Sequence, residues 1–356
     1  RSSRDKQVFS QFARERLDKQ GIQMRSYFFW QSLDEELCDI LSELIGQGVI
    51  GQLDIGIQTF SPKVIPDLQR PTNYDKFFRV IEMLHRRKIR FSLDLVLGLP
   101  GDDFEGFKDS LRKVVACKPD RTQSFPLSVL PGTAYDLRRK ELGIRTVRGS
   151  YRDDAETVIA TNSFSYSDMQ KALDLEAWMF AWYAEGLFAQ SLTALAEERG
   201  LDPLDQLDEL RRDAPMAMPD LAELVTIYRA KLYDSRSDGR YALEGRLMDV
   251  FGKVYAQLVA YYTAKRASAA TLDLLRDELL TFPKTQAAAM QLDGVDGVTV
   301  QGRALRQNGK TYQWRRDPVI GAIVRNKNFY TWSVENANQH YSGDYRAQGA
   351  GAGVPA

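Results

Sequence analysis

Cysteine and histidine are scarce in this chain, since its 356 residues include only two of each. Cys38 and Cys117 are too few for a disulfide framework, and both fall in helix-like patterns, which predicts buried thiols rather than metal or redox ligands. His85 lies in the charged run LHRRK, so we expect it to be exposed to solvent. No apolar run reaches the roughly 18 residues of a membrane span. No charged, apolar leader opens the sequence either, and we therefore expect a cytoplasmic protein.

The chain also lacks net charge, because 48 Lys and Arg residues balance 48 Asp and Glu residues. This balance excludes a global field toward nucleic acid or a membrane surface and leaves open only a local basic groove. The length allows one large domain or two ordinary ones with a sizeable core. The sequence starts without an initiator methionine, directly in the polar-faced helical run RSSRDKQVFSQFARERLDKQG, so we expect a piece of a longer polypeptide.

What the first 145 residues do contain is an alternation of strand-like and helix-like segments. The strands are apolar on both sides, which is typical of parallel sheets covered by helices. The predicted strands are Ile22–Trp30, Leu53–Gln58, Phe91–Leu97 and Thr122–Val129. The predicted helices start with a capping box at Ser32 and Glu35 and continue at Tyr74–Arg87, Phe104–Ala116 and Ala134–Leu142. These four βα units predict an α/β fold, either a barrel or an open doubly wound sheet.

After residue 145 the pattern becomes mainly helical. We expect a helical domain over 146–285, with one long helix at Ser167–Arg199 and others at Asp220–Tyr233, Tyr241–Arg266 and Ala270–Leu280. A small β-containing region should follow over 286–345, where Asn308–Gly309 stands between two alternating runs and predicts a tight hairpin. The glycine-rich segment 346–356 is expected to be a disordered tail.

A carboxylate interrupts one of the apolar strands. Asp94 stands between two leucines, where a bare charge would cost several kcal/mol unless it is paired or bound to a ligand. It is therefore either a satisfied ion pair or cap, or a carboxylate that holds a ribose diol, as acidic residues do in dinucleotide sites. Gly98, Pro100 and Gly101 follow the strand and allow a ligand to approach the backbone. In βα barrels such strand ends build the site, which favours the second interpretation.

Two further polar residues accompany the end of the preceding strand. Gln58 could cap the next helix or hydrogen-bond a polar ligand, and Gly56 before it leaves room for a close approach. Arg70 follows twelve residues later; alone it would be a solvated surface residue, but beside Gln58 it could bind a carboxylate through a charge-assisted contact. Three polar groups at consecutive strand ends predict a ligand site.

Three segments of this region, GIQTF…LQRP, DLVLGLPGDD and FPLSVLPGT, together resemble the later half of the radical S-adenosylmethionine (SAM) barrel. The resemblance covers roughly Arg25–Arg145 and points to coproporphyrinogen dehydrogenase-like and cobalamin-dependent members. It implies a partial radical SAM (βα) barrel over residues 1–145. It also implies that seven residues bind SAM through side chains or backbone: Gln58, Arg70, Asp94, Gly98, Leu99, Pro100 and Leu130.

The chain departs from this family in its metal ligands. The Cys-x3-Cys-x2-Cys loop of the family is absent, and Cys38 and Cys117, distant in sequence and helical, cannot replace it at an iron–sulfur cluster. We therefore expect no metal ligand in this chain and the [4Fe-4S] cysteines upstream of it. The family often has a glutamate where Asp54 stands, so no role is assigned to that position.

The function implied by the resemblance is that of the C-terminal part of a radical SAM enzyme, in which SAM and the cluster supply a 5′-deoxyadenosyl radical. The segment DEELCDILSELIGQGVIGQLDIGIQT resembles the cobalamin-dependent branch, which implies methylation of an unactivated carbon of a small molecule or peptide. The alternatives are a cobalamin-free coproporphyrinogen dehydrogenase-like oxidoreductase and a non-catalytic SAM-binding scaffold. An electron donor such as flavodoxin or ferredoxin is the implied partner. The catalytic residues and the substrate cannot be read from the sequence.

Overall fold

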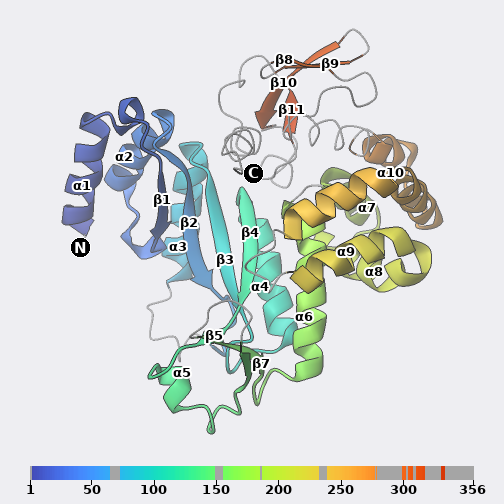
Figure 1. Ribbon diagram of the computed structural model, residues 1–356, viewed down its shortest axis with the longest axis horizontal. Coiled ribbons are helices and arrows are strands. Elements are labelled where there is room, and N and C mark those ends of the chain that lie inside the picture. Colours follow the sequence, from blue (N-terminus) through green and yellow to red (C-terminus); the bar gives the residue numbers. More distant parts are fainter. Residues whose placement is uncertain are drawn as a thin grey trace, which may run out of the picture. The chain divides into compact units, whose positions relative to one another are not determined.

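The computed structural model describes residues 2–64, 73–148, 155–184, 187–231, 239–276, 278, 299–301, 304–307, 310–316 and 330–332 (Figure 1). The chain divides into two compact units, Arg1–Ala172 and Leu173–Ala356. The predicted boundary between residues 145 and 146 thus falls inside the first unit. The predicted tail, 346–356, lies outside the described residues.

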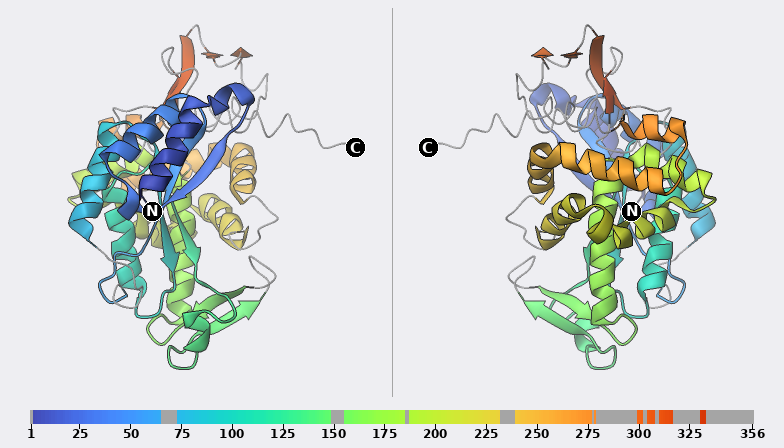
Figure 2. Two further views of the ribbon diagram at one scale, coloured as in Figure 1. Left: turned by 90° about the vertical axis from the view of Figure 1, so that its left-hand side faces the viewer. Right: turned by 90° about the vertical axis from the view of Figure 1, so that its right-hand side faces the viewer.

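The first unit is built on a four-stranded parallel sheet. Its strands β1 (Met24–Phe28), β2 (Ile50–Gln58), β3 (Phe91–Leu97) and β4 (Arg121–Pro126) lie side by side in sequence order. Three helices, α2 (Glu35–Gly46), α3 (Tyr74–Arg86) and α4 (Phe104–Ala116), connect them. When each strand is added on the same side of the one before it, right-handed crossovers place all connecting helices on one face of the sheet, as in a barrel. In a doubly wound sheet the strand order reverses once, and helices cover both faces. In both views of Figure 2, α3 and α4 lie on the same side of the sheet.

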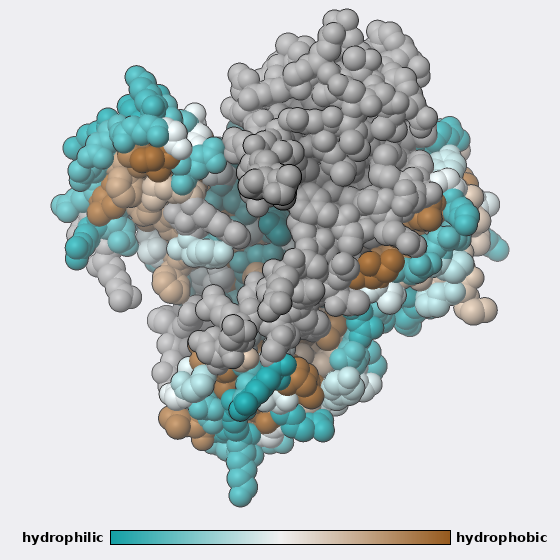
Figure 3. Space-filling model, viewed as in Figure 1, coloured by the Kyte–Doolittle hydropathy of each residue, from teal (hydrophilic) through white to brown (hydrophobic). Residues whose placement is uncertain are grey.

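The helix-covered face carries the apolar core of this unit. Alternate strand residues are fully buried there, as are the predicted stripes of the helices: Leu53, Ile55, Phe91, Leu93, Leu95, Leu37, Leu41, Leu44, Phe77, Leu84, Leu111 and Val114. Toward solvent, α1 (Ser2–Arg14) and α2 are mainly hydrophilic (Figure 3). The cap of α2 is Asp34, which accepts the N–H of Leu37 at 3.0 Å. The predicted cap, Ser32, was wrong, since it ends a 3-10 turn and donates to the Phe29 carbonyl at 2.7 Å.

A second, smaller sheet in the first unit was not predicted. It is antiparallel, with the order β5 (Ser128–Val129), β7 (Glu156–Ala160), β6 (Arg145–Arg148). An apolar cluster lies beside these strands and includes Leu99 from the loop after β3: Val64, Leu99, Leu127, Val129, Ile144 and Val158. The short helix α5 (Ala134–Leu137) covers only the start of the predicted segment.

Up to residue 278, the described residues of the second unit are mainly helical. The expected helix 167–199 is divided into α6 (Tyr166–Met179), a π-helical turn (Phe180–Ala184) and α7 (Ala189–Glu198), and α6 begins in the first unit. Further helices are α8 (Pro203–Ala217), which was not predicted, α9 (Pro219–Lys231) and α10 (Gly239–Ala264). No described helix is long and apolar enough to cross a membrane.

A buried carboxylate caps the first turn of α7. Glu278 accepts the backbone N–H groups of Gln190 at 2.5 Å and Ser191 at 3.0 Å. Burial raises the pKa of Glu278 to about 7, and these hydrogen bonds offset only part of that effect. The group is therefore a buried acid that holds two segments of the unit together.

The described residues of the small β region form four strands, β8 (Thr299–Gln301), β9 (Ala304–Gln307), β10 (Lys310–Arg316) and β11 (Tyr330–Trp332). Gln307 pairs with Lys310 in an antiparallel ladder, which confirms the two strands of the predicted hairpin. The predicted turn residues, Asn308 and Gly309, lie outside the described residues.

Candidate functional site

The face of the parallel sheet opposite the core helices carries two rows of polar residues. Strand register places Tyr27, Asp54, Ser92 and Arg121 in one row, and Gly56, Asp94 and Gln123 in the next row toward the carboxyl ends. Side chains alternate along a strand, so these residues share one face. Parallel sheets are usually apolar on both faces. We call Asp54, Ser92, Asp94, Arg121 and Gln123 the polar face, and its composition indicates a ligand site rather than packing.

Asp94 is the most perturbed group of the polar face. Its side chain is 8% exposed, and its Oδ1 has no hydrogen-bond partner within the described residues. Burial, and next the charge of Asp54, raise the pKa of Asp94 to about 7, against the smaller opposing effects of Arg121, Gln123 and Ser92. A buried oxygen without a partner is costly, and a ligand hydroxyl or N–H would satisfy it.

Asp54 is by contrast fully engaged. It is 2% exposed, and its Oδ1 accepts the Ser92 hydroxyl at 2.9 Å and the Gln52 amide at 2.8 Å. These two bonds fix its side chain between β2 and β3. Asp54 is therefore fixed in the row next to Asp94, and its charge acts on Asp94 from that position.

Gln58 is held against Gly56, the register partner of Asp94. The backbone of Gln58 has a φ of +74°, a conformation that costs a non-glycine residue roughly 1–2 kcal/mol. The register of β2 shifts between Gly56 and Gln58, and the Gln58 amide nitrogen lies 3.0 Å from where a Cβ on Gly56 would stand. The absence of that Cβ thus makes room for the amide. The structure brings Gln58 and Asp94 to neighbouring positions, whereas Arg70 lies outside the described residues.

The other predicted contacts lie in the loops beyond the strands. Gly98, Leu99 and Pro100 are buried, and Leu99 packs in the apolar cluster of the small sheet. Gly98 has a φ of +84°, and a Cβ there would lie 2.9 Å from the Sδ of Met169. Leu130 is 38% exposed, and its carbonyl accepts the Thr133 hydroxyl at 2.8 Å. Packing and turn geometry account for these four residues, and their contact with SAM stays a prediction.

The loop after Gln58 is fastened to helix α4. The Ser110 hydroxyl accepts the Phe60 N–H at 3.0 Å and donates to the Gly106 carbonyl at 2.9 Å. The Thr59 hydroxyl contacts Ser110 at 3.3 Å and accepts the Ser61 N–H at 2.9 Å. This network fixes the chain immediately after the strained Gln58, so that the strand end is held from both sides.

The cysteines do not fit an iron–sulfur cluster. Cys38 and Cys117 are buried free thiols, as predicted, and burial raises the pKa of Cys38 to about 11 and that of Cys117 to about 12. Across the described ranges, no group of three or more His, Cys, Asp or Glu residues could hold a metal. The expected exposure of His85 was wrong, because its ring is partly buried against Phe91, and its Nε2 lies 2.9 Å from the Cys117 carbonyl.

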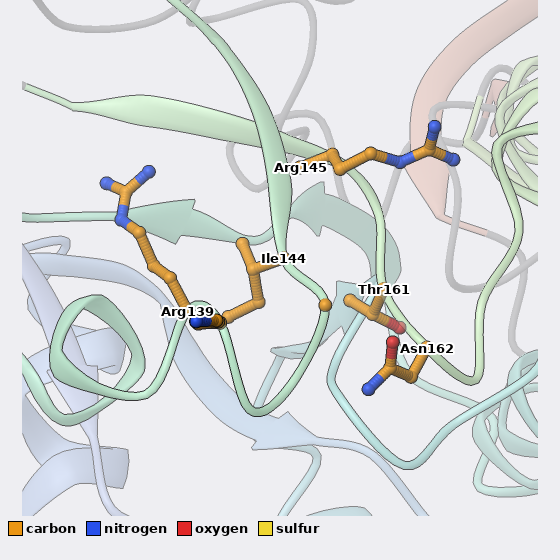
Figure 4. Close-up of a pocket in the computed structure, with 7 residues that line it drawn as sticks. Arg139, Ile144, Arg145, Thr161 and Asn162 are labelled. Atoms are coloured by element: carbon orange, nitrogen blue, oxygen red, sulfur yellow. The ribbon is translucent and has the colours of Figure 1, made fainter.

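An open cavity of about 670 Å³ lies beside the small sheet rather than on the polar face (Figure 4). Arg139 and Arg145 line it, but Figure 4 shows their side chains pointing away from each other. The guanidinium of Arg139 is already paired with Asp136 and Glu156, both at 2.6 Å. The cavity therefore offers no convergent set of groups.

No protein-family model matches the chain. An uncharacterized protein of Methanocaldococcus jannaschii is 27% identical over 101 residues, which cover 28% of this chain and 31% of that protein. The oxygen-independent coproporphyrinogen III oxidase of Escherichia coli is 31% identical over 105 residues, which cover 29% of this chain and 22% of the oxidase. The chain thus spans less than a third of the length of these curated relatives.

Two solved structures are similar at lower identity. The radical SAM methyltransferase TsrM of Kitasatospora setae, solved with cobalamin and a [4Fe-4S] cluster, is 13% identical with a TM-score of 0.38, over 59% of this chain and 49% of TsrM. The coproporphyrinogen III oxidase HemN of Escherichia coli, described as a radical SAM enzyme, is 14% identical with a TM-score of 0.34, over 73% of this chain and 69% of HemN. By sequence, the chain is thus a distant relative of a coproporphyrinogen III oxidase and of an uncharacterized protein, in each case over less than a third of its own length.

Proposed function

We propose that this chain forms the SAM-binding later half of a radical SAM barrel. The observation that carries the proposal is the partnerless, buried Oδ1 of Asp94 on the polar face. A ribose hydroxyl is a donor of the kind this oxygen needs. In this proposal Gln58 hydrogen-bonds the same ligand, and Arg70 binds its carboxylate.

The residues fit SAM but not the cluster. SAM offers hydroxyl donors for Asp94 and a carboxylate for an arginine, and the missing Cβ of Gly56 leaves room for the Gln58 amide. The two buried thiols cannot converge on iron, so we propose that the [4Fe-4S] cysteines lie upstream of Arg1. When SAM is bound beside such a cluster, the pair supplies a radical that removes hydrogen from an unactivated carbon. This chain orients the nucleoside and excludes water from it.

Within this class we propose cobalamin-dependent methylation of a small molecule or peptide, with flavodoxin or ferredoxin as electron donor. The sequence resemblance around Asp34–Thr59 supports this choice. The 31% identity with the coproporphyrinogen oxidase favours the alternative, a cobalamin-free oxidative enzyme. Titration of the polypeptide with methylcobalamin separates the two enzyme classes. Only a cobalamin-dependent methylase should change the absorption spectrum of cobalamin when the protein is present at an equal concentration.

The SAM site is tested by equilibrium dialysis of labelled SAM with the 356-residue chain. Asp94→Ala and Arg70→Ala should each raise the dissociation constant roughly 10-fold or more, the loss expected for a charge-assisted hydrogen bond. The melting temperature should change little. Asp94→Asn keeps the shape of the side chain and removes its charge, and Arg79→Ala, on the exposed side of α3, is the matched arginine control.

Two outcomes would contradict the proposal. A large drop in melting temperature with unchanged SAM affinity would show that Asp94 and Arg70 are structural. Failure of the unmodified chain to bind SAM at millimolar concentration would remove the proposed function itself.

A further inference from the structure

Two side chains of β4, the strand next to β3, lie beside Asp94 on the same face of the sheet. Gln123 is the register partner of Asp94, and Arg121 pairs with Ser92 one row earlier. Their positions are therefore directly opposite and diagonal to Asp94 on the same face. Diagonal neighbours in a sheet are about 7–8 Å apart, within reach of a long side chain such as arginine.

The charged groups around Asp94 have opposite effects on its pKa. In the described part of the chain, Asp54 faces it from β2 and Arg121 from β4, while α4 covers the opposite side of the sheet. Asp54 raises the pKa of Asp94, whereas the Arg121 charge and the Gln123 hydrogen bond lower it. Because burial also favours the neutral acid, Arg121 and Gln123 act against both of the effects that would protonate Asp94.

We infer that Arg121 and Gln123 are positioning residues that favour the ionised, hydrogen-bond-accepting form of Asp94, with its Oδ1 directed to the ligand. This inference rests on the proposed function, in which that ligand is SAM. A carboxylate accepts hydroxyl donors on both oxygens, whereas the protonated acid loses an acceptor site. The affinity for SAM should then depend on a charge that does not itself contact the ligand.

The expected signature is a pH profile. If only the ionised form of Asp94 binds, with a pKa of about 7, the dissociation constant should rise about 10-fold between pH 8 and pH 6. Arg121→Gln should shift the midpoint of this profile to higher pH and weaken binding several-fold at pH 7. Its curve should rejoin that of the unmodified chain above pH 9. Arg121→Lys retains the charge and should restore most of the profile.

The experiment is SAM binding by calorimetry from pH 6 to pH 9 with the full chain. The pH dependence of SAM binding by Asp94→Asn reports the titration of SAM itself, and it is subtracted from the profile of the unmodified chain. Arg79→Gln is the control for loss of an arginine charge. A uniform loss of affinity at all pH values, together with a lower melting temperature, would show that Arg121 is merely structural. Superimposable profiles of Arg121→Gln and the unmodified chain would overturn the inference.

A measurement without ligand separates this inference from the proposed function. Carboxyl ¹³C NMR of aspartate-labelled chain reads the Asp94 titration directly, assigned by its loss in Asp94→Asn. Arg121→Gln and Gln123→Leu should each raise the pKa of Asp94. An unchanged Asp94 pKa refutes the role of Arg121 and Gln123 even if SAM binds. Absence of SAM binding with the expected pKa shift refutes only the proposed function.

Discussion

Substitution of Gly106 by alanine should destabilise the first unit, although the same change in most helices is stabilising. Gly106 lies in the first turn of α4, where a Cβ would overlap the Oδ1 of Asp102 and lie 3.3 Å from the Ser61 hydroxyl. Asp102 is 1% exposed and cannot swing into solvent. Overpacking of this kind costs about 1–3 kcal/mol. The gain in helix propensity returns about 1 kcal/mol, so we expect a net loss of up to about 2 kcal/mol.

Hydrogen-exchange mass spectrometry on peptides of α4 in the full chain measures this loss as roughly 10-fold faster exchange. Gly46→Ala is the control, because no atom lies within 4 Å of a Cβ at this position in α2, and it should slow exchange slightly. In an Asp102→Ala background, where the obstructing carboxylate is gone, Gly106→Ala should become stabilising. The reasoning is refuted if Gly106→Ala alone stabilises the unit as Gly46→Ala does.

Three further outcomes are expected from the same structure. The pKa of Glu278 is raised from 4.5 to about 7, so the free energy of unfolding of its unit should fall by about 3 kcal/mol as the pH rises from about 4.5 to 7. Urea titrations at both pH values should show this fall. If the fall persists in Glu278→Gln, it belongs to another group. Gly98→Ala should lower the free energy of unfolding by about 1–3 kcal/mol, because its φ is positive and Met169 must move. Gly132→Ala is the control, since Gly132 has a φ of +77° but no atom within 4 Å of a Cβ, and it should lower the free energy of unfolding less. Equal losses in the two variants would rule out the packing effect. The thiols of Cys38 and Cys117, whose pKa values burial raises to about 11 and 12, should react with a disulfide reagent at pH 8 only after denaturation; fast labelling of the native chain would contradict their burial.

The core of the first unit was predictable because local and global signals agree there. The apolar run at Phe91–Leu97 and the amphipathic segment at Phe104–Ala116 became β3 and α4 with the predicted bounds. By contrast, β6 and β7 were missed, since β6 is mostly exposed and carries no alternation that a single sequence reveals. Its stability comes from pairing with β7, which is a tertiary effect.

The candidate site was predictable only where a residue conflicts with its surroundings. Asp94 was found because it interrupts an apolar strand. Arg121 and Gln123 were missed because β4, RTQSFP, is polar at most positions, and only its register shows which of them face Asp94. The available signal was their spacing of two residues at the start of a strand. The partial burial of His85 was missed for a similar reason, since its charged neighbours in sequence are not its neighbours in space.

The sequential order of the parallel strands has a consequence for how the protein folds during synthesis. Each strand pairs with the strands just before and after it in the chain, as Met24 with Ile50, Leu53 with Phe91, and Ser92 with Arg121. These partners are 26, 38 and 29 residues apart, and the entropic cost of closing a loop grows only slowly with its length. A nascent chain can thus dock each βα unit as it leaves the ribosome. Asp94 would then stay open on its β4 side until Arg121 and Gln123 arrive with that strand.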